Sequence, residues 1–409
     1  MRYVVLGSSA AGVNGVRELR KLDKEAEIIL VSKDRNIYSR CILHHYLAGE
    51  RDMERICFAE KDFERLYNIT WMKGRACVGL KPAEKKVVLD GEEELSYDKL
   101  LIATGSHTFI PPVKNLKEAE NVVGFRNIED MEVLKEVART SKHIIVMGAG
   151  LVGLDCASGF LELGVPVTLV EMAGWLLSKQ LDERAAKTYQ EAFAERGIAQ
   201  YYGVGVAEAV LDEQNRITEV ILTDGKKLPC DYVVVTAGVR SNVEFLEGSG
   251  IETSRFGLIY DETGKTSDEN IYGAGDLSGT SPIWPVAVKE GIIAASNMAG
   301  VPRKMTDFFA SKSTMNFLGI PSMSLGDVNR ADEEAKMEIQ DTKESYKKIV
   351  HKNGKIIGAI LQGDLAYGGI LQQLIARKID ITKVKKPVFD IDYSDFFHMK
   401  DNFEFYYDE

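Results

Sequence analysis

Residues 143 to 153 read HIIVMGAGLVG, a largely β-branched run that enters a turn with three glycines. In a dinucleotide-binding fold, the first glycine permits the tight turn, the second lets the backbone approach a pyrophosphate, and the third lets helix and strand pack closely. Gly148, Gly150 and Gly153 stand at these three places. Amides at the start of the following helix then hold the phosphates. The stretch therefore predicts a strand, a phosphate-binding turn and a helix.

The strand after this helix bears on cofactor choice. It is expected over residues 165 to 170, and Glu171 comes directly after it. An acidic residue at this place binds ribose hydroxyls and repels a 2′-phosphate. Glu171 therefore favours NADH over NADPH.

The same pattern opens the chain. Residues 3 to 12 read YVVLGSSAAG, and an expected helix and second strand follow by residue 31. Gly7 and Gly12 supply two of the three glycines, and Ser9 takes the middle place, where a small residue still allows close approach. The chain thus carries an internal duplication of a dinucleotide fold.

The ribose-binding acid is displaced in the N-terminal copy. Its second strand is followed by Ser32-Lys33-Asp34, so Asp34 is the candidate for the ribose contact. An ordinary surface charge is the alternative interpretation of Asp34, and both remain open.

The remaining pattern gives the domain order. Further strands are expected over 85–89, 97–103 and 232–236, Pro111-Pro112 marks a crossing between domains, and a helical stretch covers 286–299. We predict an α/β protein with two Rossmann-like dinucleotide-binding domains, one inserted in the other, and a small C-terminal α+β domain. The expected domains are residues 1–108 with 241–305, residues 109–240, and residues 306–409.

The C-terminal domain is indicated by a change of pattern. Strand-like stretches over 346–350 and 355–361 are separated by the turn Asn353-Gly354, and a helix is expected over 367–377. The tail from residue 392 is acidic and aromatic, and its structure is not assigned from the sequence.

Composition limits the function classes. The chain has 51 Lys and Arg against 62 Asp and Glu, and a net charge of -11 opposes binding to nucleic acid or an anionic membrane. Five scattered cysteines without CxxC or zinc-ligand spacing favour reduced thiols in the cytoplasm. Met1 leads straight into an apolar strand, and no apolar run approaches the roughly 18 residues of a membrane helix. We therefore expect a cytoplasmic protein without a membrane or nucleic-acid partner.

Three further motifs indicate a family. Residues 97–105 read YDKLLIATG, residues 236–242 read TAGVRSN and residues 271–276 read IYGAGD. With the two glycine turns, they resemble the pyridine nucleotide-disulfide oxidoreductase superfamily over nearly the whole chain. The resemblance implies that the N-terminal copy holds FAD, that Asp276 bonds the ribityl chain, and that the second copy holds the nicotinamide cofactor. Asp155 stands where many relatives carry glutamate.

The resemblance and the glycine turns together imply two sets of cofactor-binding residues. The FAD set, in residues 1–108 and 241–305, comprises Gly7, Ser9, Ala10, Ala11, Gly12, Asp34, Arg40, Ala103, Thr104, Gly105, Gly275, Asp276 and Ala287. The NAD(H) set, in residues 109–240, comprises Gly148, Gly150, Leu151, Val152, Gly153, Asp155, Glu171 and Gly238. No metal ligands are predicted.

Two stretches indicate a branch of the superfamily. Residues 38–50 read YSRCILHHYLAGE and resemble NADH:rubredoxin oxidoreductases and the flavin part of nitrite reductase large subunits. Residues 346–364 are similar to the small C-terminal domain of that branch, so residues 306–409 are expected to dock an acceptor or form a dimer interface. The resemblance implies a small iron-sulfur protein as partner, and a homodimer is compatible with it.

Cys41 points to another branch as well. It stands where rubredoxin-type relatives usually carry proline, and where coenzyme A-disulfide reductases and NADH oxidases carry one redox cysteine. Arg40 and the expected helix start beside it would lower a thiol pKa. Cys41 is therefore either a redox thiol or a packing residue. Peroxidase relatives carry a histidine in the first glycine loop, which Ala10-Ala11 does not provide.

Other candidates have plain structural alternatives. Cys57, Cys77, Cys156 and Cys230 are expected to be small buried hydrophobic residues. His44 and His45 are adjacent, point apart on a helix and do not suggest a metal site. Lys289 and Glu290 lie on a helix that the resemblance puts beside the flavin pyrimidine, where its dipole would stabilise reduced flavin; a surface ion pair is the alternative.

The main functional hypothesis is an FAD-dependent NADH oxidoreductase that passes electrons from NADH through FAD to rubredoxin or a ferredoxin-like carrier. One alternative is a coenzyme A-disulfide or persulfide reductase, or an NADH oxidase, that works through Cys41. A non-enzymatic alternative is a flavin-binding subunit that docks other redox proteins. The sequence leaves the acceptor open.

Overall fold

The computed structural model describes residues 1–280, 282–306, 312–330 and 333–407. The chain divides into two compact units. The first comprises Met1–Ile110, Gly124–Glu136 and Ala237–Ala310, and the second comprises Pro111–Val123, Val137–Thr236 and Ser311–Glu409. The C-terminal segment therefore groups with the second copy of the dinucleotide fold.

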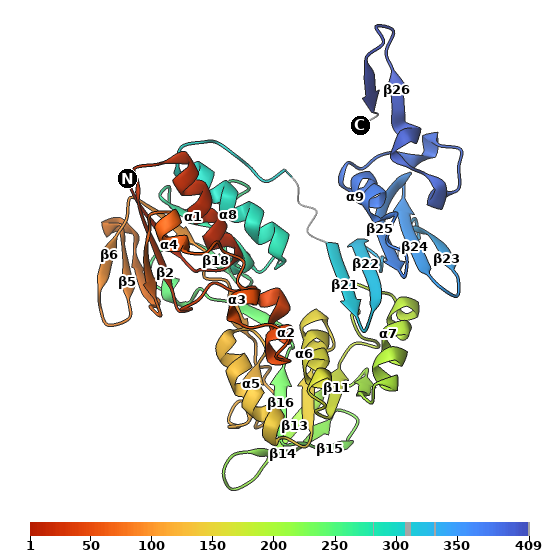
Figure 1. The fold of residues 1–409 in the computed structure, drawn as a ribbon, viewed down its shortest axis with the longest axis horizontal. Coiled ribbons are helices and arrows are strands. Elements are labelled where there is room, and N and C mark those ends of the chain that lie inside the picture. The colour runs from red at the N-terminus through yellow and green to blue at the C-terminus, as the bar shows by residue number, and fades with distance from the viewer. Residues whose placement is uncertain (281, 307–311, 331–332, 408–409) are drawn as a thin grey trace. The chain divides into compact units, whose positions relative to one another are not determined.

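A five-stranded parallel sheet forms the centre of the first unit. Its order is β20 (Ile271–Gly273), β7 (Lys99–Ile102), β1 (Arg2–Leu6), β2 (Glu27–Ser32) and β3 (Thr70–Lys73). The helices α1 (Ala10–Leu22) and α8 (Trp284–Met298) pack side by side (Figure 1). In β1, Tyr3 and Val5 belong to the core beneath these helices, whereas Val4 and Leu6 belong to the core on the other face. Burial on both faces explains the continuous apolar run of β1.

The first unit also contains short helices and small antiparallel sheets. The helices are η1 (Arg40–Ile42), α2 (Leu43–Leu47), α3 (Met53–Ile56), α4 (Phe63–Leu66), η2 (Pro82–Glu84), η3 (Glu244–Leu246) and η4 (Asp276–Ser278). The small sheets are formed by β4 (Cys77–Lys81), β5 (Lys86–Leu89) and β6 (Glu94–Ser96), by β8 (Ser106–Thr108) with β17 (Val239–Ser241), and by β18 (Thr253–Ser254) with β19 (Gly257–Leu258). Helix α5 (Ile128–Thr140) contributes residues to both units.

The second unit repeats the same architecture. Its sheet has the order β12 (Ala199–Tyr202), β11 (Val167–Glu171), β10 (Ile144–Met147), β16 (Tyr232–Val235) and β9 (Val122–Gly124). Helix α6 (Leu151–Glu162) packs on β10 and β11, and α7 (Glu183–Glu195) packs on β12. A three-stranded sheet consists of β13 (Val206–Leu211), β14 (Ile217–Leu222) and β15 (Lys227–Pro229). The predicted α/β class with two Rossmann-like folds is confirmed.

The C-terminal part of the second unit is an antiparallel sheet with one helix. The strand order is β21 (Lys312–Phe317), β22 (Ile320–Gly326), β25 (Lys355–Gln362), β24 (Tyr346–Lys352) and β23 (Lys336–Asp341). Helix α9 (Gly368–Ala376) packs on β22 and β25. The chain then forms η5 (Ile381–Lys383), η6 (Val388–Asp390), η7 (Tyr393–Phe396) and a hairpin of β26 (Phe397–Met399) and β27 (Phe405–Tyr407) (Figure 1).

Buried hydrogen bonds join this C-terminal sheet to α7. The Tyr189 hydroxyl donates to the Ile320 carbonyl at 2.6 Å, and the Gln362 side-chain amide donates to the Ala185 carbonyl at 3.1 Å. Tyr189 is fully buried and Gln362 is 4% exposed. Breaking such a bond would leave a buried donor and a buried acceptor without a partner, which is energetically costly. The sheet and α7 therefore share a common core.

Several elements differ from the sequence prediction. Helix α1 begins at Ala10, inside the glycine turn, and not after it. Strands β21, β22 and β23 were not predicted, because their Ser, Thr and charged residues weaken the alternation that marks a strand. The acidic aromatic tail contains the hairpin β26–β27. Within the described part of the chain, none of the helices is both long and apolar enough to cross a bilayer.

Candidate functional site

The first glycine loop is closed by contacts that tolerate only glycine. Gly7 has a φ of +108°, and a Cβ there would lie 2.2 Å from the Ala103 carbonyl oxygen. A Cβ on Gly12 would lie 1.8 Å from the carbonyl oxygen of Gly7. These distances are far below van der Waals contact, so both glycines are required for α1 to pack against β1 and β7.

The start of α1 has the features of an anion site. Ser9 is the N-cap residue and makes no side-chain capping bond in the described structure, and Ala10, Ala11 and Gly12 form the first turn. The N–H groups of a first turn have no partner within the helix. The hydroxyl of Ser8 is buried and has no hydrogen-bond partner among the described residues. The loop therefore fits a phosphate group of a dinucleotide.

Three small residues of the predicted FAD set converge beside this loop. A Cβ on Gly275 would lie 3.2 Å from the Ala11 Cβ and 3.6 Å from the Ala287 Cβ. A Cβ on Gly291 would lie 2.2 Å from the Ala11 carbonyl oxygen. The loop before η4, the start of α1 and the first half of α8 therefore meet at one place.

Asp276 is held by a residue that the sequence analysis missed. Arg126 Nη2 lies 2.6 Å from Asp276 Oδ2, and the same nitrogen donates to Ser106 Oγ at 2.8 Å. The two charged side chains are 18% and 19% exposed. Arg126 lies 150 positions from Asp276 in the chain, so nothing local in the sequence could have indicated the pair.

Asp34 and Arg40 of the predicted FAD set are ion-paired. Arg40 Nη2 donates to Asp34 Oδ2 at 2.7 Å, and the Tyr38 hydroxyl donates to Asp34 Oδ1 at 2.8 Å. Burial lowers the pKa of Arg40, but the charge of Asp34 and its hydrogen bond outweigh this, so the net shift is upward. Asp34 is therefore part of a partly buried polar cluster, which argues against the surface-charge alternative.

Cys41 lies in η1, directly after Arg40, and its side chain is exposed. Cys156 and Cys230 are buried, as predicted. The prediction of burial is wrong for Cys57, which is exposed, and Cys77 is only partly buried. Cys57 follows the one-turn helix α3, which is too short to cover it.

Glu290 bonds to the loop that carries Asp276. Its Oε2 accepts hydrogen bonds from the Gly275 amide at 2.7 Å and from the Tyr260 hydroxyl at 3.0 Å. Burial, with a contribution from Asp276, raises the pKa of Glu290. Lys289 is exposed. Glu290 therefore belongs to the site and positions its backbone, whereas Lys289 faces solvent.

The motif at Ala103, Thr104 and Gly105 is tied to Asn242. Thr104 Oγ1 donates to the Asn242 carbonyl at 2.9 Å, and Asn242 Nδ2 donates to the Thr104 carbonyl at 2.8 Å. The Asn242 amide donates to the Gly105 carbonyl at 2.9 Å. Two motifs that are distant in sequence thus form one backbone junction.

The second glycine loop repeats the geometry of the first. Gly148 has a φ of +107°, and a Cβ there would lie 2.8 Å from the Thr236 carbonyl oxygen. A Cβ on Gly153 would lie 2.0 Å from the Gly148 carbonyl oxygen. Gly150 caps α6, and a Cβ there would meet no atom within 4 Å. The middle glycine thus faces open space, as a pyrophosphate-binding loop requires.

Glu171 lies against this loop. Its Oε2 accepts from the Ala149 amide at 2.7 Å, and its Oε1 accepts from the Ala173 amide at 2.8 Å. The carboxylate is partly exposed at the carboxyl end of β11. It therefore presents a negative charge beside the loop, where a ribose would lie.

The first turns of α6 hold the other predicted residues of this set. Leu151 is partly buried and Val152 is exposed. Burial raises the pKa of Asp155 to about 8. Gly238 falls in the first compact unit, where its carbonyl accepts from the Phe109 amide at 3.0 Å.

The histidine pair does not behave as predicted. The rings of His44 and His45 have centroids 4.1 Å apart, so the two side chains do not diverge. Burial, followed by the charge of His45, lowers the pKa of His44 to about 4. His45 Nδ1 contacts a carboxylate oxygen of Glu50. Among the described residues, no group of three or more His, Cys, Asp or Glu side chains has a metal-binding arrangement.

Two glycine loops of this geometry, on separate parallel sheets, define the class of two-dinucleotide oxidoreductases. The family model "Pyridine nucleotide-disulphide oxidoreductase" matches residues 1–291, and the model "Rubredoxin NAD+ reductase C-terminal domain" matches residues 312–379. The chain belongs to the pyridine nucleotide-disulphide oxidoreductase family. The family uses FAD and a pyridine nucleotide, so the expected cofactors and oxidoreductase class are confirmed.

Individual relatives are named for different acceptors. The chain is 29% identical to the assimilatory nitrate reductase electron transfer subunit of Bacillus subtilis, over 95% of this chain and 51% of the relative. It is 31% identical to the rubredoxin-NAD(+) reductase of Alcanivorax borkumensis, over 67% of this chain and 72% of the relative. The solved NAD-dependent persulfide reductase from A. fulgidus has a TM-score of 0.84 and 25% identity, over 93% and 77% of the two chains. The chain spans about half the length of the first curated relatives it matches.

Proposed function

We propose that this chain takes a hydride from NADH and delivers the electrons, through FAD, to a small iron-sulfur carrier such as rubredoxin or a ferredoxin-like protein. The observation that carries the proposal is the C-terminal domain, whose residues 312–379 are similar to the C-terminal domain of rubredoxin reductases. The relative from Alcanivorax borkumensis, which is named for rubredoxin, is similar over 67% of this chain.

The first unit is the proposed FAD site. FAD accepts a hydride when bound and releases the electrons to an acceptor. The amides at the start of α1 would bind the pyrophosphate, and Ser8 would donate its hydroxyl to the same group. Arg126 holds Asp276 in one orientation, so that the carboxylate can accept a hydrogen bond from a sugar hydroxyl. Glu290 fixes the Gly275 amide beside it.

The second unit is the proposed NADH site. Gly150 leaves room for the pyrophosphate above the start of α6. Glu171 would accept hydrogen bonds from the ribose hydroxyls and oppose a 2′-phosphate. Asp155, with its raised pKa, is largely protonated at neutral pH and can therefore donate a hydrogen bond.

The acceptor is tested by stopped-flow kinetics. The flavin-loaded protein is reduced with NADH and then mixed, in parallel, with rubredoxin, ferredoxin, coenzyme A disulfide or air-saturated buffer. We expect reoxidation to be fastest with one of the two iron-sulfur proteins. Faster reoxidation by coenzyme A disulfide or dioxygen than by either carrier would reject the proposal.

A second candidate function rests on Cys41. Its exposed thiol follows Arg40 immediately, and a solved relative is named a persulfide reductase. In this alternative, the Cys41 thiolate attacks one sulfur of a disulfide or persulfide and releases the other sulfur as a thiolate or hydrosulfide. Two electrons from NADH then return the resulting cysteine disulfide or persulfide to the thiolate state.

A further inference from the structure

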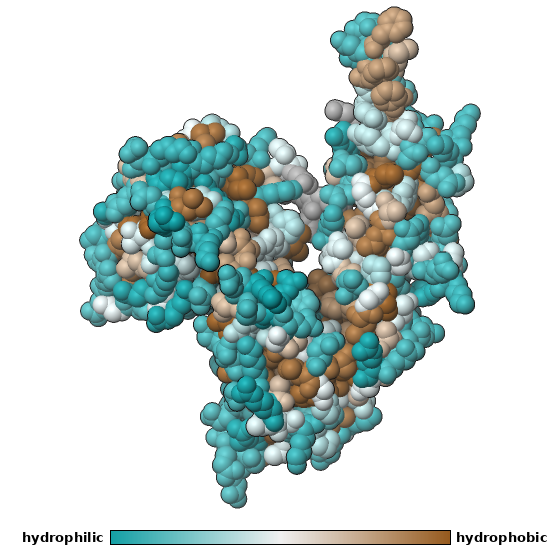
Figure 2. Space-filling model, in the orientation of Figure 1, coloured by the Kyte–Doolittle hydropathy of each residue, from teal (hydrophilic) through white to brown (hydrophobic). Residues whose placement is uncertain are grey.

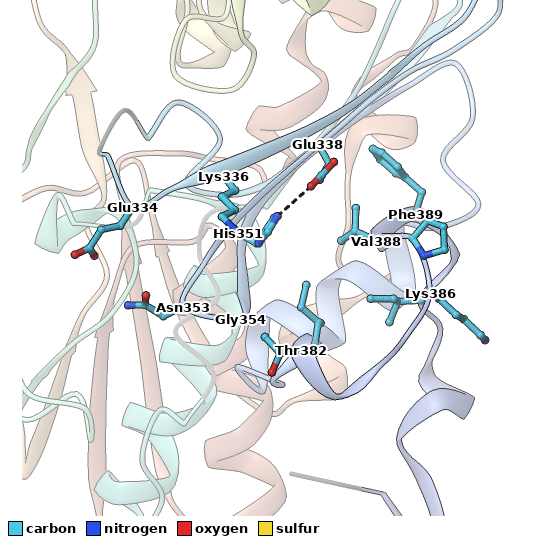
Figure 3. A pocket seen from close by; sticks show the side chains of 13 residues that line it. Glu334, Lys336, Glu338, His351, Asn353, Gly354, Thr382, Lys386, Val388 and Phe389 are labelled. Carbon is cyan, nitrogen blue, oxygen red and sulfur yellow. Dashed lines mark ion pairs between the residues drawn. The ribbon is translucent and has the colours of Figure 1, made fainter.

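A cavity in the C-terminal domain belongs to neither of the proposed cofactor sites. Its volume is about 560 Å³, within the range of about 300–1,000 Å³ that is usual for small-molecule sites (Figure 3). Its lining residues lie on and just before β23, on β24 and the turn after it, and in residues 381–391. Hydrophobic and hydrophilic residues lie next to each other on the visible face of this domain (Figure 2).

One wall of the cavity is apolar and is held in place. Pro387, Val388 and Phe389 form this wall at the start of η6 (Figure 3). The Tyr367 hydroxyl donates to the Val388 carbonyl at 3.2 Å and also contacts the Ile391 carbonyl. Because these bonds fix both ends of η6, the wall exists before any ligand binds. An apolar wall of this kind fits the face of a planar ring.

The floor of the cavity is also preformed. It consists of η5 and the turn between β24 and β25, and the Ile381 amide donates to the Gly354 carbonyl at 2.8 Å. Gly354 has a φ of +72°, and a Cβ there would lie 2.5 Å from Asp380 Oδ1. Only glycine therefore lets the two segments come this close. Asp380 in turn caps η5, because its side chain accepts from the Thr382 amide at 2.9 Å.

The wall formed by β23 and β24 carries polar groups whose bonding capacity is not used. Lys336 and His351 are directly opposite each other in the strand pairing, and Lys336 forms no ion pair with any described residue. The His351 Nε2 atom is buried and makes no hydrogen bond within the described part of the chain. Glu338 Oε1 lies 3.5 Å from this nitrogen, which is longer than an ordinary N–H···O bond (Figure 3). A buried polar atom normally has a partner, and a carboxylate would supply an acceptor for both Lys336 and His351.

The other charges of the cavity limit the charge of a ligand. Lys386 is ion-paired at 2.5 Å with an aspartate of η7, and Glu334 is ion-paired at 2.9 Å with a lysine of β24. Glu338 places a further carboxylate on the same face of β23 as Lys336. A phosphate ester with two negative charges would be repelled by both glutamates and would gain only one uncommitted ammonium. The charges therefore favour a single carboxylate over a phosphate.

We propose that this cavity binds an aromatic monocarboxylate. Its ring lies against Pro387, Val388 and Phe389, and its carboxylate lies between Lys336 and His351. The ammonium of Lys336 supplies the opposite charge, and His351 donates a hydrogen bond from Nε2. None of these residues belongs to the proposed FAD or NAD(H) set, so the proposal does not depend on the redox function.

Isothermal titration calorimetry of the flavin-loaded full chain tests the proposal, with 2-naphthoate, 2-naphthamide and 2-naphthyl phosphate as ligands. These molecules share one ring system and differ in charge. We expect 2-naphthoate to bind with a Kd below about 100 µM, and the other two to bind at least about 10-fold more weakly. Absence of saturable binding of 2-naphthoate up to about 1 mM, or tighter binding of 2-naphthyl phosphate, would overturn the proposal.

Two variants separate the charge pairing from the ring contact. Lys336→Met should weaken binding of 2-naphthoate at least about 10-fold and leave the weaker binding of 2-naphthamide unchanged, because only the charge pairing is lost. Phe389→Ala should weaken the binding of both ligands. Lys343→Met, at an exposed lysine in the turn after β23, is the matched control and should bind 2-naphthoate like the wild type. Wild-type affinity for 2-naphthoate in Lys336→Met would overturn the proposal.

Hydrogen exchange locates the bound ligand. 2-Naphthoate should slow amide exchange at least about 3-fold in residues 381–391, and it should leave the two glycine loops unchanged. Protection confined to the glycine loops would show that the ligand occupies a cofactor site, and it would reject the cavity in the C-terminal domain as the binding site.

Discussion

Glu171 has two roles at the residue scale. Its carboxylate accepts hydrogen bonds from the amides of Ala149 and Ala173, and it also lies where a 2′-phosphate would approach. The hydrogen bonds shape the loop, and in the proposed function the negative charge selects the cofactor. Glutamine at this position removes the charge and keeps one of the two acceptor oxygens, so one of the two amides loses its partner while the repulsion of a 2′-phosphate is removed.

We therefore predict that Glu171→Gln lowers the preference for NADH over NADPH by about 10- to 100-fold, which corresponds to about 1–3 kcal/mol. The measurement is kcat/KM for both cofactors. Glu162→Gln, at the end of α6, is the control and should keep the wild-type ratio. An unchanged ratio in Glu171→Gln would show that this carboxylate does not select the cofactor.

Cys41 distinguishes the two enzyme hypotheses. If it is a redox thiol beside the flavin, its thiolate should give a long-wavelength charge-transfer band, and Cys41→Ser should lose both the band and persulfide turnover. Under the carrier hypothesis, Cys41→Ser keeps most of its NADH:carrier activity. Cys57→Ser is the control, because Cys57 is also exposed in the same unit. A large loss of carrier reduction in Cys41→Ser at normal flavin content would contradict the carrier hypothesis.

Asp155 makes stability depend on pH. Its pKa of about 8 in the fold lies above the ordinary value of 3.8, so the folded state keeps a proton that the unfolded state loses. Stability from this group is therefore present at low pH and is lost as the pH rises from about 4 to 8. We predict that Asp155→Asn gains about 3–4 kcal/mol relative to wild type between pH 5 and pH 8. The midpoints of thermal unfolding of both proteins, measured across this pH range, test the prediction. The same pH dependence of the midpoint in both proteins would contradict it.

At the scale of elements, the contact between α1 and α8 depends on one glycine. A Cβ on Gly291 would lie 2.2 Å from the Ala11 carbonyl oxygen, in the turn proposed to bind FAD. We predict that Gly291→Ala lowers stability by about 1–3 kcal/mol and weakens FAD retention, because α8 must move away from α1. Gly369→Ala in α9 is the control, since a Cβ there meets no atom within 4 Å. Equal thermal midpoints and flavin content for the two variants would refute this.

Some features of these elements could be predicted from the sequence, and others could not. The glycine loops were predictable because Gly7, Gly12, Gly148 and Gly153 obey a local rule, in which a turn and a close packing contact fix the residue type. Arg126 was not predictable, because its pairing with Asp276 exists only after distant segments meet.

Three other features could not be predicted from the sequence, for similar reasons. The bonds of Glu290 to Gly275 and Tyr260 depend on tertiary packing, so a helix pattern alone could not distinguish Glu290 from its exposed neighbour Lys289. The exposure of Cys57 depends on how little of the surrounding chain covers a one-turn helix. The apolar alternation of the tail was present in the sequence, but the two strands are only three residues each and fall below what periodicity can resolve.

At the scale of the whole molecule, substitutions in the two glycine loops are expected to impair the binding of different cofactors. Gly150 has open space around it, so a side chain fits the protein but occupies the approach of the pyrophosphate. We predict that Gly150→Val keeps FAD and folds normally, yet loses flavin reduction by NADH at least about 100-fold. The companion variant Ser9→Val should instead lose FAD. Flavin absorbance measures the FAD content of each variant, and the rate of anaerobic bleaching by NADH measures flavin reduction. A folded but colourless Gly150→Val protein would reverse the assignment of the two loops.

The hydrogen bonds from Tyr189 and Gln362 give the C-terminal sheet a mechanical property. They fasten β22 and β25 to the helix layer of the second dinucleotide fold through buried groups, and not through a flexible tether. Because the contact is closely packed, a displacement of α7 also displaces the sheet. Helix α7 and the C-terminal sheet should therefore move as one rigid body. If α7 is displaced, strand β23 at the edge of this sheet is displaced with it.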